Sequence, residues 1–72
     1  MKVKFLGWIA SLAGKREMEV SLERPAQLRE ILPFSLQGRD NIIILVNNKR
    51  GSEEVTVENQ DQVVLMPVIS GG

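Results

Sequence analysis

The sequence has no cysteine, no histidine and no tyrosine, and its only aspartates are Asp40 and Asp61. The absence of thiols excludes disulfides, iron–sulfur clusters and a cysteine nucleophile. The absence of histidine removes the commonest general base and most transition-metal sites. We therefore expect a chain that has no active site, metal ion or bound cofactor of its own.

The chain also lacks an excess of charge of either sign, because nine basic and nine acidic residues balance. Its two local basic pairs, Lys15-Arg16 and Lys49-Arg50, stand beside turn-forming residues and are interpreted as solvated loop charges. No basic stripe supplies the electrostatic attraction on which nucleic-acid binding depends. No apolar stretch is long enough to cross a membrane. We expect a cytoplasmic protein whose partners are neither nucleic acid nor membrane.

Residues 1–14 have the outline of a signal peptide, with Lys2 and Lys4 ahead of an apolar stretch and small residues after it. Gly7 and Ser11 interrupt that stretch, and its beginning alternates between polar and apolar residues. Such alternation is typical of a β-strand. The sequence therefore favours a strand here over a cleaved leader.

Periodicity predicts an α+β domain. The first half of the chain is predicted to form a strand over residues 2–6, a helical turn over 8–13 closed by Gly14, a strand over 16–22 and a helix from Pro25 to Leu32. The second half is predicted to form a strand over 42–46, a turn over 47–51, and strands over 55–57 and 63–66. The first two strands pair antiparallel. In that pairing Lys2 and Lys4 lie opposite Glu17 and Glu19.

The simplest assembly of these elements is a mixed sheet of four to five strands with one main helix packed on one face. The first and last strands lie side by side and parallel in the middle of the sheet, joined by a right-handed crossover. This arrangement is the ubiquitin-like β-grasp. Residues 1–67 form the domain, because Pro67 lacks the N–H that continues a strand ladder.

Residues 68–72 form a flexible C-terminal tail in this interpretation, and Ser70-Gly71-Gly72 end it. Glycine has no Cβ, so two in a row make a thin arm that carries one chemical group, the terminal carboxylate. Val68 and Ile69 form an apolar stem for the arm. The alternative is a frayed terminus without a role.

These features resemble the ThiS/MoaD sulfur carriers of the ubiquitin-like β-grasp group. The resemblance spans the whole domain and is most specific over residues 59–72, where a polar turn, an apolar strand, a short stem and Gly-Gly follow one another. Asp61 matches the second aspartate of the family's turn, whereas Asn59 and Gln60 depart from it. Val46-Asn47 is similar to the family's Val-Asn. The helical turn up to Gly14 is MoaD-like and the stem is ThiS-like.

The resemblance implies a chemistry that uses the carboxylate of Gly72. A ubiquitin-activating-like adenylyltransferase consumes ATP to form an acyl adenylate, and sulfur transfer converts it to a thiocarboxylate. The acceptor is a synthase subunit or a thiazole synthase, in molybdopterin, thiamin or tRNA-thiolation pathways. Ser70, Gly71 and Gly72 thread the partner's channel.

Partner binding is predicted on the sheet face opposite the helix. Side chains alternate along a strand, so one face of the two apolar strands carries Ile43, Leu45, Val64 and Met66, and the stem adds Val68 and Ile69. An exposed apolar patch of this kind marks an interaction site. The alternative is that a loop covers these residues.

Two other functions stay open. A ubiquitin-like modifier would use the same activated Gly72 to form isopeptide bonds with lysines of target proteins. A plain interaction domain would end in Gly-Gly by coincidence.

Overall fold

The computed structural model describes residues 1–68. Its elements, in chain order, are β1 (Lys2–Phe5), α1 (Ile9–Ala13), β2 (Glu17–Glu19), β3 (Ala26–Gln27), α2 (Leu28–Ile31), β4 (Ile42–Val46), β5 (Lys49–Gly51), β6 (Thr56–Val57) and β7 (Gln62–Pro67). No helix in this part of the chain has the length and apolar character needed to span a bilayer.

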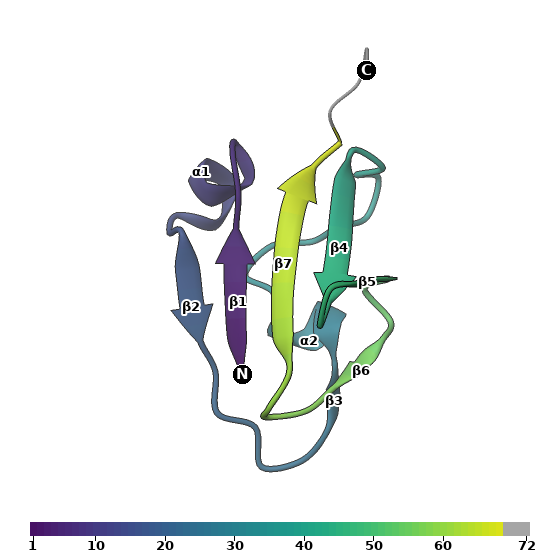
Figure 1. Cartoon of the computed structure of the whole chain (residues 1–72). Coiled ribbons are helices and arrows are strands. Elements are labelled where there is room, and N and C mark those ends of the chain that lie inside the picture. The colour runs from purple at the N-terminus through teal and green to yellow at the C-terminus, as the bar shows by residue number, and fades with distance from the viewer. Residues whose placement is uncertain (69–72) are drawn as a thin grey trace.

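Five strands form one mixed sheet in the order β2-β1-β7-β4-β5 (Figure 1). β1 and β7 pair in parallel in the middle, with Val3 opposite Val63. Their neighbours β2 and β4 are antiparallel to them. The predicted β-grasp sheet, with the first and last strands side by side at its centre, is confirmed. Lys2 and Lys4 also lie opposite Glu19 and Glu17, as predicted.

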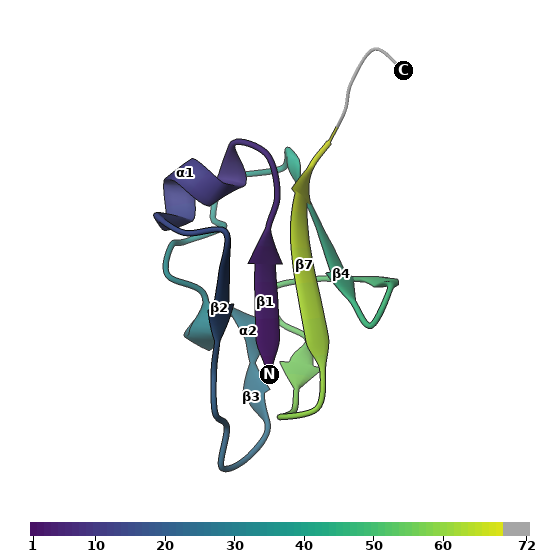
Figure 2. The same cartoon turned by 60° about the vertical axis from the view of Figure 1, so that its left-hand side comes forward.

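Both helices and the long loop after α2 lie on one side of the sheet, as the two views of Figures 1 and 2 show together. The core is on that side. Its fully buried side chains come from the two central strands, the two helices and β6: Val3, Phe5, Ile9, Leu28, Val57, Val63 and Leu65. Full burial of a side chain of this size contributes about 1.5–3 kcal/mol. Two residues of the long loop pack against this core, because Leu36 is buried and the ring of Phe34 lies 6.0 Å from that of Phe5.

The predicted start of the main helix at Pro25 is wrong. Ala26 and Gln27 are extended and pair with β6 as a separate two-stranded sheet, so the helix α2 begins at Leu28 and has four residues. Proline at that position is compatible with a first helical turn but does not require one. The pairing with β6 prevails over this local preference. Leu28 is nevertheless the buried anchor of the helix.

The predicted turn over residues 47–51 is too long. Lys49–Gly51 is the edge strand β5, paired with β4, and only Asn47 and Asn48 turn the chain. Their φ angles are +51° and +70°. A two-residue hairpin loop of the primed type needs positive φ at both central residues, and asparagine tolerates it well.

Two other predicted strands are shorter than expected. Only Glu17–Glu19 of residues 16–22 is a strand, although Val20 and Leu22 still pack against the core. Thr56–Val57 pairs with β3 and does not join the main sheet. By contrast, Gly14 caps α1 in the left-handed conformation as predicted, with its N–H donating to the carbonyl oxygen of Ala10.

Candidate functional site

The predicted tail begins where β7 leaves the sheet. The ladder with β4 reaches Pro67, which lies opposite Ile42. The backbone N–H of Val68 then donates to the carbonyl oxygen of Asn41 at 3.0 Å, and the side chain of Val68 is exposed. Ile69, Ser70, Gly71 and Gly72, on which the predicted stem and threading end depend, lie outside the described residues. The domain boundary at residue 67 and the roles of the tail residues stay predictions.

Gly7, in the connection between β1 and α1, lies against the end of β7. Its φ is +57°, and a Cβ built on it would lie 2.9 Å from Cγ of Pro67. The connection between β1 and α1 therefore passes close against the proline ring, and only glycine fits there without a shift. This contact fixes the position of the last residues before Val68.

The four predicted partner-binding residues of the strands share the sheet face opposite the helices. Ile43 lies directly opposite Met66, and Leu45 lies directly opposite Val64. All four side chains are half-buried, whereas the alternate residues Ile44, Val63 and Leu65 are buried in the core. We call this side of the sheet the outer face and these four residues the apolar patch. Their contact with a partner stays a prediction.

Sequence reasoning missed Leu6 and the two cations that border the apolar patch. Leu6 follows the buried Phe5, so alternation directs it to the outer face, and it is 42% exposed. Lys4 lies opposite Val64 on one side, and Arg50 lies opposite Leu45 on the other. Lys4 and Leu6 were recognisable from the alternation of β1. Arg50 was not, because its segment was predicted as a turn.

Two turns are joined by a side-chain clasp between Asn47 and Asp61, the residues that carried part of the family resemblance. The amide nitrogen of Asn47 donates to Oδ1 of Asp61 at 2.9 Å. The amide oxygen of Asn47 accepts from the backbone N–H of Gln62 at 3.0 Å. Oδ2 of Asp61 accepts from the backbone N–H of Glu58 at 2.7 Å. The clasp fixes the start of β7 against the end of β4.

The same hydrogen bonds change the acidity of the Asp61 carboxyl. Donation from Asn47, and then from the backbone of Glu58, stabilises the carboxylate and lowers the pKa of Asp61 below its ordinary value of 3.8. Asp61 is therefore ionised at neutral pH. In this structure the ionised carboxylate holds two turns together.

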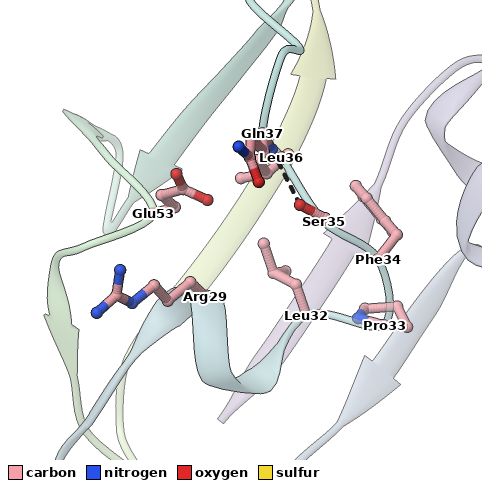
Figure 3. A pocket seen from close by; sticks show the side chains of 8 residues that line it. All are labelled: Arg29, Leu32, Pro33, Phe34, Ser35, Leu36, Gln37 and Glu53. Carbon is pink, nitrogen blue, oxygen red and sulfur yellow. Dashed lines mark hydrogen bonds between the residues drawn. The ribbon is translucent and has the colours of Figure 1, made fainter.

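A shallow pocket of about 560 Å³ lies on the other side of the sheet (Figure 3). It is lined by Arg29 of α2, by residues 32–37 of the following loop, and by Glu53. Its lining includes one cation and one anion, Arg29 and Glu53, which lie on the same side of it, and the side chain of Leu32 points into the space between α2 and the loop. Among residues 1–68, no predicted partner-binding residue lines this pocket, so it is separate from the apolar patch on the outer face.

The sheet order, the helices on one side and the parallel central pair define a ubiquitin-like β-grasp domain. The ThiS family model matches residues 3–72. The chain therefore belongs to the ThiS family, whose members are ubiquitin-like sulfur carriers of the ThiS/MoaD type. A search of curated proteins gave no significant match.

Two solved structures are similar to the whole domain. The crystal structure of SAMP1 from Haloferax volcanii has a TM-score of 0.73 and 24% identity, and the match covers 100% of this chain and 98% of that one. A putative molybdopterin converting factor, subunit 1, from Pyrococcus furiosus has a TM-score of 0.70 and 22% identity, with 94% and 95% covered. At this identity the similarity establishes the fold.

Proposed function

We propose that the chain is a sulfur carrier of the MoaD/ThiS type and that its Gly72 is the group that a partner enzyme activates. In the first step a carboxylate oxygen of Gly72 attacks the α-phosphorus of ATP, and pyrophosphate leaves. A sulfur nucleophile at the oxidation level of sulfide then displaces AMP from the acyl adenylate. The product is a thiocarboxylate on Gly72, which donates its sulfur to an acceptor.

The observation that carries this proposal is the family match over residues 3–72, which includes Gly71 and Gly72. A free carboxylate is a poor electrophile, and adenylation supplies the leaving group that it lacks. All catalytic groups for both steps belong to the partner. The composition of the chain is compatible with that division, since no cysteine thiol is present to intercept the activated carbonyl.

The proposed partners are a ubiquitin-activating-like adenylyltransferase and a sulfur-accepting synthase subunit or thiazole synthase. The apolar patch is the proposed docking surface for them. Its four side chains are half-buried in the isolated chain, and no helix of residues 1–68 covers that side of the sheet. Met66, the half-buried methionine of this patch, suits a surface that meets successive partners, because its side chain adapts to different shapes.

Deletion of Gly72 tests the proposal. The truncated chain should keep its circular dichroism spectrum and melting temperature but lose ATP–pyrophosphate exchange with the host's adenylyltransferase. The control is Lys15→Ala, since Lys15 is exposed in the connection between α1 and β2 and Gly72 is kept. This control should support exchange at the rate of the unaltered chain. Normal exchange by the truncated chain would refute the proposal.

Intact mass of the protein purified from its host separates the carrier from the alternative. A carrier shows one terminal oxygen replaced by sulfur. A ubiquitin-like modifier shows covalent conjugates joined through Gly72 to lysines of other proteins. The fold similarity to SAMP1 is compatible with both. The same measurement after deletion of the acceptor pathways, one at a time, identifies the pathway that consumes the sulfur.

A further inference from the structure

We propose that the outer face binds a partner surface whose apolar centre is bordered on two opposite sides by carboxylates, which meet Lys4 and Arg50. The inference rests on the proposed function, because it specifies the surface by which the adenylyltransferase recognises this chain. The apolar patch alone would accept many apolar surfaces, whereas the two cations require that the partner also carries carboxylates at matching positions.

The two cations lie in one line across the sheet. Arg50 of β5 pairs with Leu45 of β4, Leu45 pairs with Val64 of β7, and Val64 pairs with Lys4 of β1. Residues that pair directly across strands direct their side chains to the same face. Neighbouring strands are about 4.8 Å apart, so the Cα atoms of Arg50 and Lys4 are separated by about 14 Å. Leu45 and Val64 lie between them.

The other charges of the outer face are already neutralised close by. Glu17 lies 3.9 Å from the ammonium of Lys2, and Glu19 lies 3.8 Å from the N-terminal amine. Glu17 lies opposite Lys4 in the strand register, but its ion pair is with Lys2. Neither Lys4 nor Arg50 takes part in an ion pair within residues 1–68, and both residues are exposed. Two unpaired positive charges therefore remain, one on each side of the apolar patch.

An apolar patch with a cation on each side favours a protein partner over a nucleic acid or a second copy of this chain. The chain as a whole is neutral, so an acidic macromolecule gains no general attraction from it. A nucleic acid would leave Leu45 and Val64 facing phosphates. A second copy of this chain would present the same two cations, and like charges across an interface are unfavourable. A partner protein with an apolar ridge between two carboxylates about 14 Å apart would contact the apolar patch with the ridge and Lys4 and Arg50 with the carboxylates.

Charge substitution tests the inference with the purified adenylyltransferase of the same host as the probe. One variant is Lys4→Glu with Arg50→Glu, and a milder one is Lys4→Gln with Arg50→Gln. The matched control is Lys15→Glu with Arg24→Glu, which changes the net charge equally in connections outside the sheet. Stopped-flow association rates are measured between low and physiological salt, and circular dichroism checks that each variant is folded.

The Glu pair should reduce the association rate by about tenfold at low salt, and the difference should shrink as salt rises, because opposite surface charges steer encounter. The Gln pair should lie between the Glu pair and the unaltered chain, and the control should change the rate by less than about twofold.

Equal rates for the Glu pair and the control, while the unaltered chain still supports pyrophosphate exchange, would overturn the inference and leave the proposed function standing. Absence of exchange by the unaltered chain would overturn both. A stable dimer through the outer face, seen by sedimentation, would also overturn the inference.

Discussion

Substitution of Gly7 by alanine is expected to destabilise the domain through two separate effects. The backbone at Gly7 has a φ of +57°, where a residue with a Cβ is less stable by about 1–2 kcal/mol. The new Cβ also lies 2.9 Å from Cγ of Pro67, which is closer than carbon atoms tolerate. Overpacking of this kind typically costs about 1–3 kcal/mol.

The two effects together lower the free energy of unfolding by about 2–5 kcal/mol. For a domain of this size that corresponds to a fall of about 10 °C or more in melting temperature. The assay is urea and thermal unfolding followed by circular dichroism. Because Pro67 is the last residue of β7, the same change should also disturb the adjoining hydrogen bond from Val68 to Asn41, seen as faster amide exchange at Val68.

Gly14 provides the control for the backbone effect alone. Its φ is +78°, and a Cβ built on it meets nothing within 4 Å. Gly14→Ala should therefore cost only about 1–2 kcal/mol. The double variant with Pro67→Ala isolates the steric effect, because Gly7→Ala should cost less once the proline ring is absent. Equal losses for Gly7→Ala and Gly14→Ala, with no coupling to Pro67, would refute the steric argument.

Two further predictions follow from the clasp and from the outer face. Asp61→Asn should cost about 1–2 kcal/mol at neutral pH, since an amide cannot accept from both Asn47 and Glu58. Because the folded pKa of Asp61 is below its ordinary 3.8, this stabilisation is complete above that pH and disappears as the pH falls through the lowered value. Urea unfolding at stepwise lower pH should show the difference from the unaltered chain shrinking, and a difference independent of pH contradicts the assignment. Met66→Glu should weaken partner binding, measured by titration calorimetry, with little change in melting temperature, whereas Leu65→Ala on the core side should cost about 2–5 kcal/mol. A large loss of stability from Met66→Glu would instead place its side chain in the core.

The elements of the central sheet were predictable because period-2 alternation and apolar runs are local signals. Val3 and Phe5 alternate with lysines in β1, so this strand and its inward residues follow from the sequence. Ile42–Val46 is apolar throughout, which predicts a strand but does not by itself say which of its residues face inward. The alternating direction of side chains along a strand only groups Ile43 with Leu45, and Val64 with Met66. The cap at Gly14 was predictable because left-handed backbone favours glycine.

The errors arose where pairing with another strand, and not a local sequence signal, decides the structure. Ala26 and Gln27 have no strand signal of their own, and they are extended because β6 pairs with them from the other half of the chain. Lys49 and Arg50 follow two asparagines and resemble the rest of a loop, yet they pair with β4 as soon as a two-residue turn reverses the chain. Arg50, one of the two cations that border the apolar patch, was missed for the same reason, since its position opposite Leu45 becomes visible only with the register.

β7 joins the two strand pairs of the main sheet, since it bonds to β1 on one side and to β4 on the other. Without it, the β1–β2 hairpin and the β4–β5 hairpin have no common ladder, and the chain has two fragments in place of a sheet. Pairing of β1 with β7 brings together residues separated by nearly the whole chain. The loop-closure entropy of this step is lost before the non-local contacts form that compensate for it, so we expect it to be slow. A partner that contacts both the outer face and the end of β7 therefore binds only the folded domain, because a half-folded chain does not bring these two features together.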